Sequence, residues 1–202
     1  VGAGRARFRR CFVAGSVDFV FGAGAALFED CELHSRFRPD KPRQGYVAAP
    51  STSIAQDVGL VFLRCRLTRE TQVPARSVVL GRAWRPTRDF PDGRYGDPSA
   101  VGSAVFARCW MDEHIAAEGW EPMNYTARDG TRVALAPAQA RLFEFESTGP
   151  GAIADANRRV LSAEDARRYL ELPAAWAFGA TGTASRSQRE ASKVARVGAS
   201  VG

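Results

Sequence analysis

The feature that most constrains the fold of this chain is a short unit, Phe-x-x-Cys, that occurs four times. An apolar residue lies two positions after each cysteine, and the copies are Phe8–Cys11, Phe28–Cys31, Phe62–Cys65 and Phe106–Cys109. Successive cysteines are 20, 34 and 44 residues apart. The shortest spacing has room for strands and turns, whereas a helical repeat needs roughly 30 residues or more for its two helices. The repeat therefore predicts a β-solenoid with coils of about 20 residues and insertions of growing length.

In such a solenoid, equivalent residues of neighbouring coils stack about 4.8 Å apart, so the phenylalanines and the cysteines should each form a ladder. Simple strand alternation would place the Phe and the Cys of one unit on opposite faces, so a bend between them is needed to bring both inward. We expect the thiols to be small buried hydrophobes rather than disulfides. The cysteine count therefore does not argue for an extracytoplasmic location.

Three β-rich runs, Ser16–Phe21, Gly45–Pro50 and Ser77–Trp84, should align as one parallel sheet of this solenoid. Asp18 lies among bulky hydrophobic residues of the first run, a costly place for an unpaired charge. Arg82 lies in the third run, and strand alternation places it on the same face as Trp84. The pattern predicts an ion pair between Asp18 and Arg82, either as a structural salt bridge or as part of a functional site.

These runs carry a resemblance to a known family. Gly15–Gly22 (GSVDFVFG) resembles the G-[ST]-V-D-F-I-F-G signature of pectinesterases, and Leu80–Trp84 (LGRAW) resembles their L-G-R-P-W. Gly45–Ser53 (GYVAAPSTS) is similar to the G-Y-[IL]-T-A-P-S-T of the bacterial branch, as is Asp92–Pro98. The similarity runs from about residue 4 to about 178. Two signatures in the right order, separated by a third, make a specific match.

The resemblance implies an all-β fold, a right-handed parallel β-helix, which agrees with the repeat. It also implies a carboxylic ester hydrolase that removes methyl esters from polygalacturonate (pectin) without a cofactor or a metal. By the family pattern Asp18 is the nucleophile and forms a covalent acyl intermediate. Arg82 holds Asp18 ionised and oriented, because an adjacent cation lowers the pKa of a carboxylate.

The resemblance also implies a sugar-binding groove beside the nucleophile. Trp84 and Phe21 would line it, although Phe21 can face the groove only if the chain turns near Val20. Thr87 and Met123 fall at substrate-contacting positions of the family. A loop hydroxyl and a packing methionine are the alternatives for these two residues.

The chain departs from the family upstream of the nucleophile. The family uses a second aspartate as general acid and then base, in a Q-D-T motif one coil earlier, and glutamines that stabilise the oxyanion. That motif should lie about 20 residues before Asp18, and the chain begins 17 residues before it. We therefore interpret the chain as N-terminally incomplete and expect it to be inactive or weakly active alone, because one oxyanion donor contributes about 10² to 10³ in rate.

Two alternatives remain open: a non-catalytic solenoid that binds acidic polysaccharide, and a family member that acts on another ester or thioester. Pectate lyases share the solenoid but use clustered acidic calcium ligands. The carboxylates Asp89, Asp92 and Asp97 are better explained as turn residues.

Composition limits the other classes of function. There are only two histidines, so a histidine-ligated metal or a histidine triad is not expected, and His34 and His114 should have surface or structural roles. The net charge is +6, and half of it falls in residues 179–202, which we interpret as a disordered basic tail. We find no basic stripe with interleaved aromatics and no apolar run of about 20 residues, so neither nucleic acid nor a membrane is an expected partner.

The remaining predictions concern setting and loops. We expect a monomer that binds pectin or another galacturonate polymer in an extracellular or periplasmic location, although no signal peptide opens the sequence. Residues 85–103 form a long connection that should rise beside the groove. Ser162 is a plausible N-cap for a short C-terminal helix that ends at Leu170 and packs on the solenoid.

Overall fold

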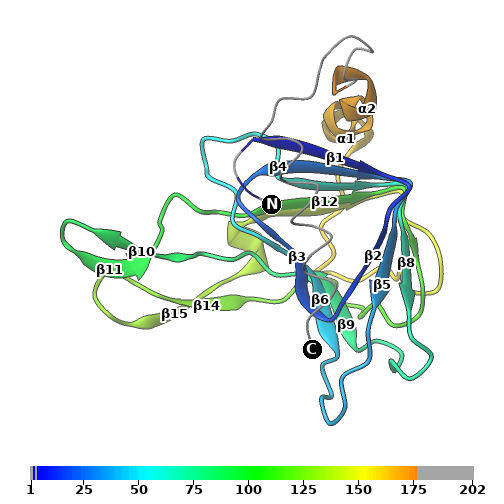
Figure 1. Ribbon diagram of the computed structural model, residues 1–202, viewed down its shortest axis with the longest axis horizontal. Coiled ribbons are helices and arrows are strands. Elements are labelled where there is room, and N and C mark those ends of the chain that lie inside the picture. The colour runs from blue at the N-terminus through cyan, green and yellow to red at the C-terminus, as the bar shows by residue number, and fades with distance from the viewer. Residues whose placement is uncertain (1, 3, 177–202) are drawn as a thin grey trace.

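The computed structural model describes residues 2 and 4–176, so the predicted boundary at 178 and the predicted tail 179–202 lie outside the described residues. Three parallel sheets form the sides of a triangular solenoid (Figure 1). The first sheet contains, in order, β1 (Arg5–Arg9), β4 (Ala25–Glu29), β7 (Leu60–Leu63), β12 (Ser103–Ala107) and β16 (Arg141–Phe145). The second contains β2 (Phe12–Gly15), β5 (Glu32–Ser35), β8 (Arg66–Arg69) and β13 (Trp110–Met111). The third contains β3 (Val17–Gly22), β6 (Gly45–Pro50) and β9 (Val78–Gly81).

Each of the first three coils contributes one strand to each sheet in turn, the fourth contributes β12 and β13, and the last contributes β16. Strands that neighbour one another therefore come from successive coils. The pairs in all three sheets are parallel, and the register places each Phe of the repeat beside the Phe of the next coil. Parallel strands joined in this way almost always have right-handed connections. The predicted right-handed parallel β-helix is confirmed.

The Phe-x-x-Cys units form two ladders inside the solenoid, as predicted. Ring centroids of successive phenylalanines along the ladder are 4.6, 5.1 and 4.3 Å apart, and the planes are nearly parallel. All four cysteines are free. The thiols of Cys31, Cys65 and Cys109 each lie 3.3 to 3.5 Å from the carbonyl oxygen of the phenylalanine one coil earlier.

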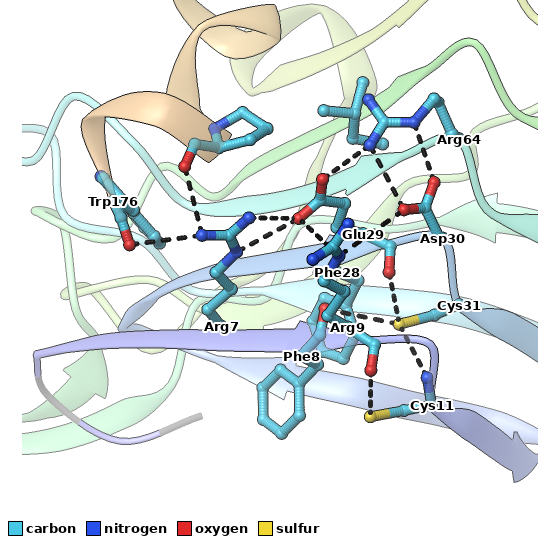
Figure 2. Close-up of polar contacts among 12 residues, drawn as sticks. Arg7, Phe8, Arg9, Cys11, Phe28, Glu29, Asp30, Cys31, Arg64 and Trp176 are labelled. Carbon is cyan, nitrogen blue, oxygen red and sulfur yellow. Dashed lines mark hydrogen bonds and ion pairs between the residues drawn. The ribbon is translucent and has the colours of Figure 1, made fainter. Parts of the chain in front are cut away.

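The bend that brings both residues inward lies one position before each cysteine. Arg10, Asp30, Arg64 and Arg108 occupy this corner with φ of 52° to 53°, a left-handed conformation that reverses the side-chain alternation. Three of these side chains pair between coils: Arg64 Nε lies 2.8 Å from Asp30 Oδ1 (Figure 2), and Arg108 Nε lies 2.8 Å from Glu146 Oε2. The corner therefore combines a buried thiol with an exposed ladder of charges.

Two short helices cover the outer face of the first sheet (Figure 1). Helix α1 (Ala163–Leu170) begins after Ser162, whose Oγ accepts a hydrogen bond from Asp165 N and donates one to Asp165 Oδ2, which confirms the predicted cap. Helix α2 (Leu172–Ala175) follows it. Tyr169 and Trp176 pack on the sheet, so these helices cover a second apolar layer outside the solenoid interior.

The side chain of Arg7 also links α2 to the first sheet of the solenoid (Figure 2). Arg7 donates to the backbone oxygens of Pro173 and Trp176 at 3.1 and 3.5 Å. The same guanidinium lies 2.5 Å from Glu29, which Arg64 also contacts at 2.6 Å. Burial alone would raise the pKa of Glu29, but hydrogen bonds and charges from the two arginines outweigh it and lower that pKa.

Two antiparallel hairpins project from the solenoid beside the third sheet (Figure 1). The predicted connection 85–103 contains the first, formed by β10 (Thr87–Phe90) and β11 (Gly93–Gly96). The second is formed by β14 (Met123–Thr126) and β15 (Arg132–Leu135), and a 3₁₀ turn, Pro137–Gln139, follows it. Strand β11 lies against β14, so the two hairpins support each other.

Of the two roles expected for His114, the structure assigns the structural one. Its side chain is fully buried, and neither ring nitrogen has a hydrogen-bond partner among the described residues. Burial lowers the pKa of His114 from 6.5 to about 4. The His114 imidazole therefore stays neutral in the folded protein down to about pH 4, whereas in the unfolded chain the same imidazole takes up a proton below about pH 6.5.

The stability that His114 contributes should be complete above about pH 6.5 and should be lost as the pH falls toward 4, by about 3 kcal/mol in total. Urea unfolding at several pH values should show that His114→Leu removes this acid-dependent loss. His34→Gln is the control, because His34 is only half-buried and hydrogen-bonds Thr68 at 2.8 Å. Parallel pH curves for wild type and His114→Leu would contradict the prediction.

Candidate active site

Asp18 projects from an irregularity in the third sheet. Val17 of β3 pairs with Tyr46 of β6, and Val20 pairs with Ala48, so β3 has one extra residue between the two pairs. Asp18 occupies this bulge with φ of 50°. The bulge reverses the alternation, so that Val20 faces the core and Phe21 is 54% exposed. The turn expected near Val20 therefore lies two residues earlier, at Asp18.

The predicted ion pair forms with bidentate geometry. Arg82 Nε lies 3.0 Å from Asp18 Oδ1, and Nη2 lies 2.7 Å from Oδ2. Both side chains are about one-fifth exposed. Two parallel charge-assisted hydrogen bonds fix the plane of the carboxylate as well as its position. The carboxylate is thus oriented by arginine and remains accessible from outside.

Arg82 is itself held from two sides. Its backbone N–H donates to Ala48 O at 3.0 Å, and its guanidinium carbon lies 3.8 Å from the centroid of the Tyr46 ring. Burial, the largest single influence, would lower the pKa of Arg82, but the hydrogen bonds and charge of Asp18, with further contributions from Tyr46 and Glu121, raise it overall. Arg82 is therefore a permanent cation next to Asp18.

A hollow of about 280 Å³ opens in front of the carboxylate. It is lined by Val17, Asp18, Phe21, Ala49, Trp84 and Met123. The rings of Phe21 and Trp84 meet edge to face, with centroids 6.1 Å apart and an angle of 68° between their planes. One carboxylate at the end of an otherwise apolar, partly aromatic surface suits a ligand with both a flat apolar face and a polar reacting group.

The structure brings four of the six predicted site residues to this hollow, namely Asp18, Phe21, Trp84 and Met123. Arg82 reaches it through its bond to Asp18. Thr87 does not line it, because it begins β10 and pairs with Gly96 in the first hairpin.

Sequence reasoning missed Tyr46, Glu121 and Arg43, which lie behind Arg82. Burial raises the pKa of Tyr46, and the hydrogen bond between Tyr46 and Glu121 raises it further. Arg43 Nη2 in turn lies 2.6 Å from Glu121 and 2.5 Å from Glu118. Tyr46 stands within the quoted G-Y-V-A-A-P segment, but no local pattern indicates that it stacks on an arginine 36 positions away.

Chemically, the site offers a carboxylate that is oriented by Arg82 and lies beside an apolar wall. Such a carboxylate can attack an electrophilic carbonyl carbon or accept a hydrogen bond from a sugar. Within residues 2 and 4–176, no group of three or more histidine, cysteine, aspartate or glutamate side chains is arranged to hold a metal ion. No helix in the described part of the chain is long and apolar enough to cross a membrane.

Comparison with known proteins gives consistent matches. The family model described as Pectinesterase matches residues 1–163. Pectinesterase A of Dickeya chrysanthemi is 44% identical over 160 residues, which are 77% of this chain and 43% of the relative. Pectinesterase 31 of Arabidopsis thaliana is 32% identical over 149 residues, which are 73% of this chain and 38% of the relative.

Solved structures agree with these sequences. Pectin methylesterase PemA from Erwinia chrysanthemi superposes with a TM-score of 0.83 at 41% identity, covering 90% of this chain and 54% of that one. A pectin methylesterase in complex with a hexasaccharide gives 0.84 at 41% identity with the same coverage. The carrot enzyme, at 23% identity and a TM-score of 0.64, shares the fold over 92% of this chain and 56% of its own. The chain thus spans about half the length of the relatives it matches.

Proposed function

The chain belongs to the pectinesterase family, and from this premise we propose that its Asp18 site hydrolyses the methyl esters of polygalacturonate in pectin. The observation that carries the proposal is the bidentate pair of Asp18 and Arg82 at the edge of the aromatic hollow. This is the arrangement that a carboxylate nucleophile requires: paired with a cation, oriented and open to the substrate.

In the proposed reaction, an Asp18 oxygen attacks the ester carbonyl carbon and the bond from that carbon to the methoxy oxygen breaks. The departing methoxy group takes a proton from a general acid and leaves as methanol, and Asp18 is left in an acyl anhydride with the sugar. Water then attacks the anhydride, which releases the free galacturonate and regenerates Asp18. Arg82 holds Asp18 in the attacking orientation in the first step and pairs with the carboxylate as it departs in the second.

The walls of the hollow supply the contacts proposed for the sugar. The rings of Trp84 and Phe21 offer apolar faces to a pyranose ring, and the Met123 side chain extends the same surface. Thr87 would reach only a longer ligand that extends to the first hairpin. The relative whose structure contains a hexasaccharide supports an oligosaccharide ligand.

We propose a monomer that acts in an extracellular or periplasmic location.

The hollow contains one carboxylate and no amide side chain among the described residues that line it. The mechanism also needs a general acid and oxyanion donors, and each missing oxyanion donor lowers the rate by about 10² to 10³. We therefore propose that the 202 residues alone are inactive or weakly active. Groups from further coils upstream would complete the site.

Methanol release from methyl-esterified pectin tests both parts of the proposal. The 202-residue chain should be slower by at least about 10² than the same chain joined to the upstream part of Dickeya pectinesterase A. Equal rates for the two proteins would contradict the proposed impairment. A joined protein that folds but releases no methanol would contradict ester hydrolysis.

The presence of only one carboxylate among the residues that line this hollow also favours a second candidate function. In this function the solenoid binds acidic polysaccharide and catalyses no reaction. This candidate predicts that both proteins bind galacturonate oligomers and that neither releases methanol.

A further inference from the structure

Tyr46 lies on the middle strand of the third sheet, between the strands that carry the two members of the ion pair. In β6 it pairs with Val17 of β3 on one side and with Val79 of β9 on the other. Asp18 directly follows Val17, and Arg82 directly follows the end of β9. Tyr46 is therefore placed where it can support the pair from within the sheet.

The backbone of Tyr46 is held close to the strand of Asp18. Tyr46 N donates to Ser16 O at 2.9 Å, two residues before Asp18. The preceding residue has to be glycine, because a Cβ on Gly45 would overlap with the same Ser16 oxygen. This close approach fixes where the Tyr46 ring leaves the sheet relative to the bulge at Asp18.

The ring and the carboxylate hold the Arg82 guanidinium in two different directions. Asp18 accepts hydrogen bonds from Nε and Nη2, which lie in the plane of the guanidinium. The Tyr46 ring covers a face of that plane, with its centroid 3.8 Å from the guanidinium carbon, and its π-electrons attract the cation. The carboxylate thus fixes the edge of the group, and the ring fixes its tilt.

The Tyr46 ring is itself tethered at its far end. Its hydroxyl donates a hydrogen bond to Glu121. Arg43 Nη2 lies 2.6 Å from Glu121 and 2.5 Å from Glu118, so the acceptor carboxylate is also held by a cation. The backbone N–H of Glu121 donates to Gly81 O at 3.2 Å, one residue before Arg82. The ring that supports Arg82 is therefore anchored to the next coil.

Glu121 also supplies a second negative charge near Arg82. Burial lowers the pKa of Arg82, whereas Asp18, and then Tyr46 and Glu121, raise it. In the proposed reaction Asp18 loses its charge when it is acylated, but Glu121 keeps its own. The guanidinium then still has the ring on its face and a carboxylate nearby, so it stays in place until the Asp18 carboxylate departs from the anhydride.

We propose that Tyr46 and Glu121 are positioning residues of the Asp18 site: Tyr46 fixes the tilt of the Arg82 guanidinium, and Glu121 holds the ring and balances Arg82 while Asp18 is acylated. The inference rests on the proposed function and assigns two further residues to the same site. Neither residue lines the hollow in front of Asp18, so both act through Arg82.

Hydrogen exchange of the Arg82 Nε–H, followed by NMR in the 202-residue chain, tests the positioning without any reaction. The signal is identified by its absence from Arg82→Lys. Tyr46→Leu should accelerate exchange about 10-fold or more, because the guanidinium can then tilt away from Asp18. Tyr46→Phe, which keeps the ring, and Glu121→Ala, which keeps the ring but not its anchor, should each accelerate exchange only about 3-fold.

Glu146→Ala is the matched control for Glu121→Ala. Glu146 also pairs with an arginine, Arg108, at 2.8 Å, but it lies on the corner ladder and does not contact the third sheet. This variant should leave the exchange rate of the Arg82 Nε–H unchanged. Thermal unfolding of each variant establishes that the fold is retained.

Kinetics of methanol release in the chain joined to upstream coils test the consequence for catalysis. Tyr46→Leu should lower kcat about 10-fold and change KM less than about 2-fold, because the guanidinium acts on the attacking carboxylate rather than on the bound sugar. Tyr46→Phe should restore most of kcat. A rise in KM with unchanged kcat in Tyr46→Leu would overturn the proposal, since a residue that only contacts the sugar behaves in that way.

The exchange rates separate this proposal from the proposed function. It is overturned if Tyr46→Leu exchanges no faster than wild type, or if Glu121→Ala behaves as Glu146→Ala does. A joined protein that releases no methanol in its wild-type form would overturn ester hydrolysis. The positioning of Arg82 by Tyr46 and Glu121 would still be decided by the exchange rates.

Discussion

Asp18→Asn, introduced into the chain joined to upstream coils, is expected to reduce the initial rate of methanol release by about 10⁴ to 10⁶-fold, as for the loss of other enzyme nucleophiles. The substitution removes the charge and the attacking oxygen and leaves an amide of the same shape. Asparagine is also among the residues that accept a positive φ, so the bulge at φ of 50° should be retained. The loss should therefore report on chemistry rather than on folding.

Asp30→Asn is the matched control. Asp30 also has a positive φ, 53°, and its carboxylate also pairs with an arginine, Arg64, at 2.8 Å. It occupies the corner between the first two sheets, away from the hollow in front of Asp18. This variant should keep its rate of methanol release. An Asp18→Asn protein that retains more than about one-hundredth of the rate would exclude Asp18 as the nucleophile.

The largest loss of stability is expected from Arg158→Met, about 3 to 5 kcal/mol in the free energy of unfolding. Both oxygens of Glu144 lie 2.8 Å from Arg158 Nη1, and the two side chains are only 7% and 3% exposed. Burial raises the pKa of Glu144, and the charge of Arg158 offsets only part of that rise. Without Arg158, the carboxylate would be left buried with no counter-charge.

Arg158 also contacts the segment that supports the active site. Its Nε donates to Ala117 O at 3.0 Å, and its Nη2 donates to Gly151 O. Three residues after Ala117, Trp120 forms a backbone bridge to Gly81, next to Arg82. In addition to lowering stability, the substitution should therefore loosen the third sheet at the end of β9, directly before Arg82.

Chemical denaturation with matched variants tests this prediction. Arg108→Met breaks an exposed pair with Glu146, whose side chains are 49% and 55% exposed, and should cost no more than about 1 kcal/mol. The double variant Arg158→Met/Glu144→Leu should recover much of the loss, because it removes the stranded charge as well. Equal effects of Arg158→Met and Arg108→Met would contradict the buried-pair explanation.

The repeat was sufficient to predict the solenoid because its signal is periodic and local. Each Phe-x-x-Cys unit has the same strand, corner and inward thiol, so four weak local preferences specify one architecture. The short helix after Ser162 was predictable for the same reason, since its cap lies within three residues. Asp18 and Arg82 were identifiable as partners because each is a charge within an apolar run.

Other features depend on contacts between coils, whose register is not visible in any one segment. Tyr46 stacks on Arg82 only because β6 lies between β3 and β9. Glu144 and Arg158 are both charged and both buried, which no local pattern indicates. Thr87 lies outside the hollow in front of Asp18 because the insertion that contains it folds into a hairpin.

The sequence alone thus determined the coil, its inward ladders and the face that carries Asp18, Arg82 and Trp84, because these follow from side-chain periodicity and from the cost of burying charge. Only the tertiary structure decided that a bulge at Asp18 turns Phe21 outward and which residues line the hollow in front of Asp18. Those features depend on how stacked coils and inserted hairpins meet, and residues more than 60 positions apart, such as Asp18 and Arg82, come within 3 Å only through that stacking.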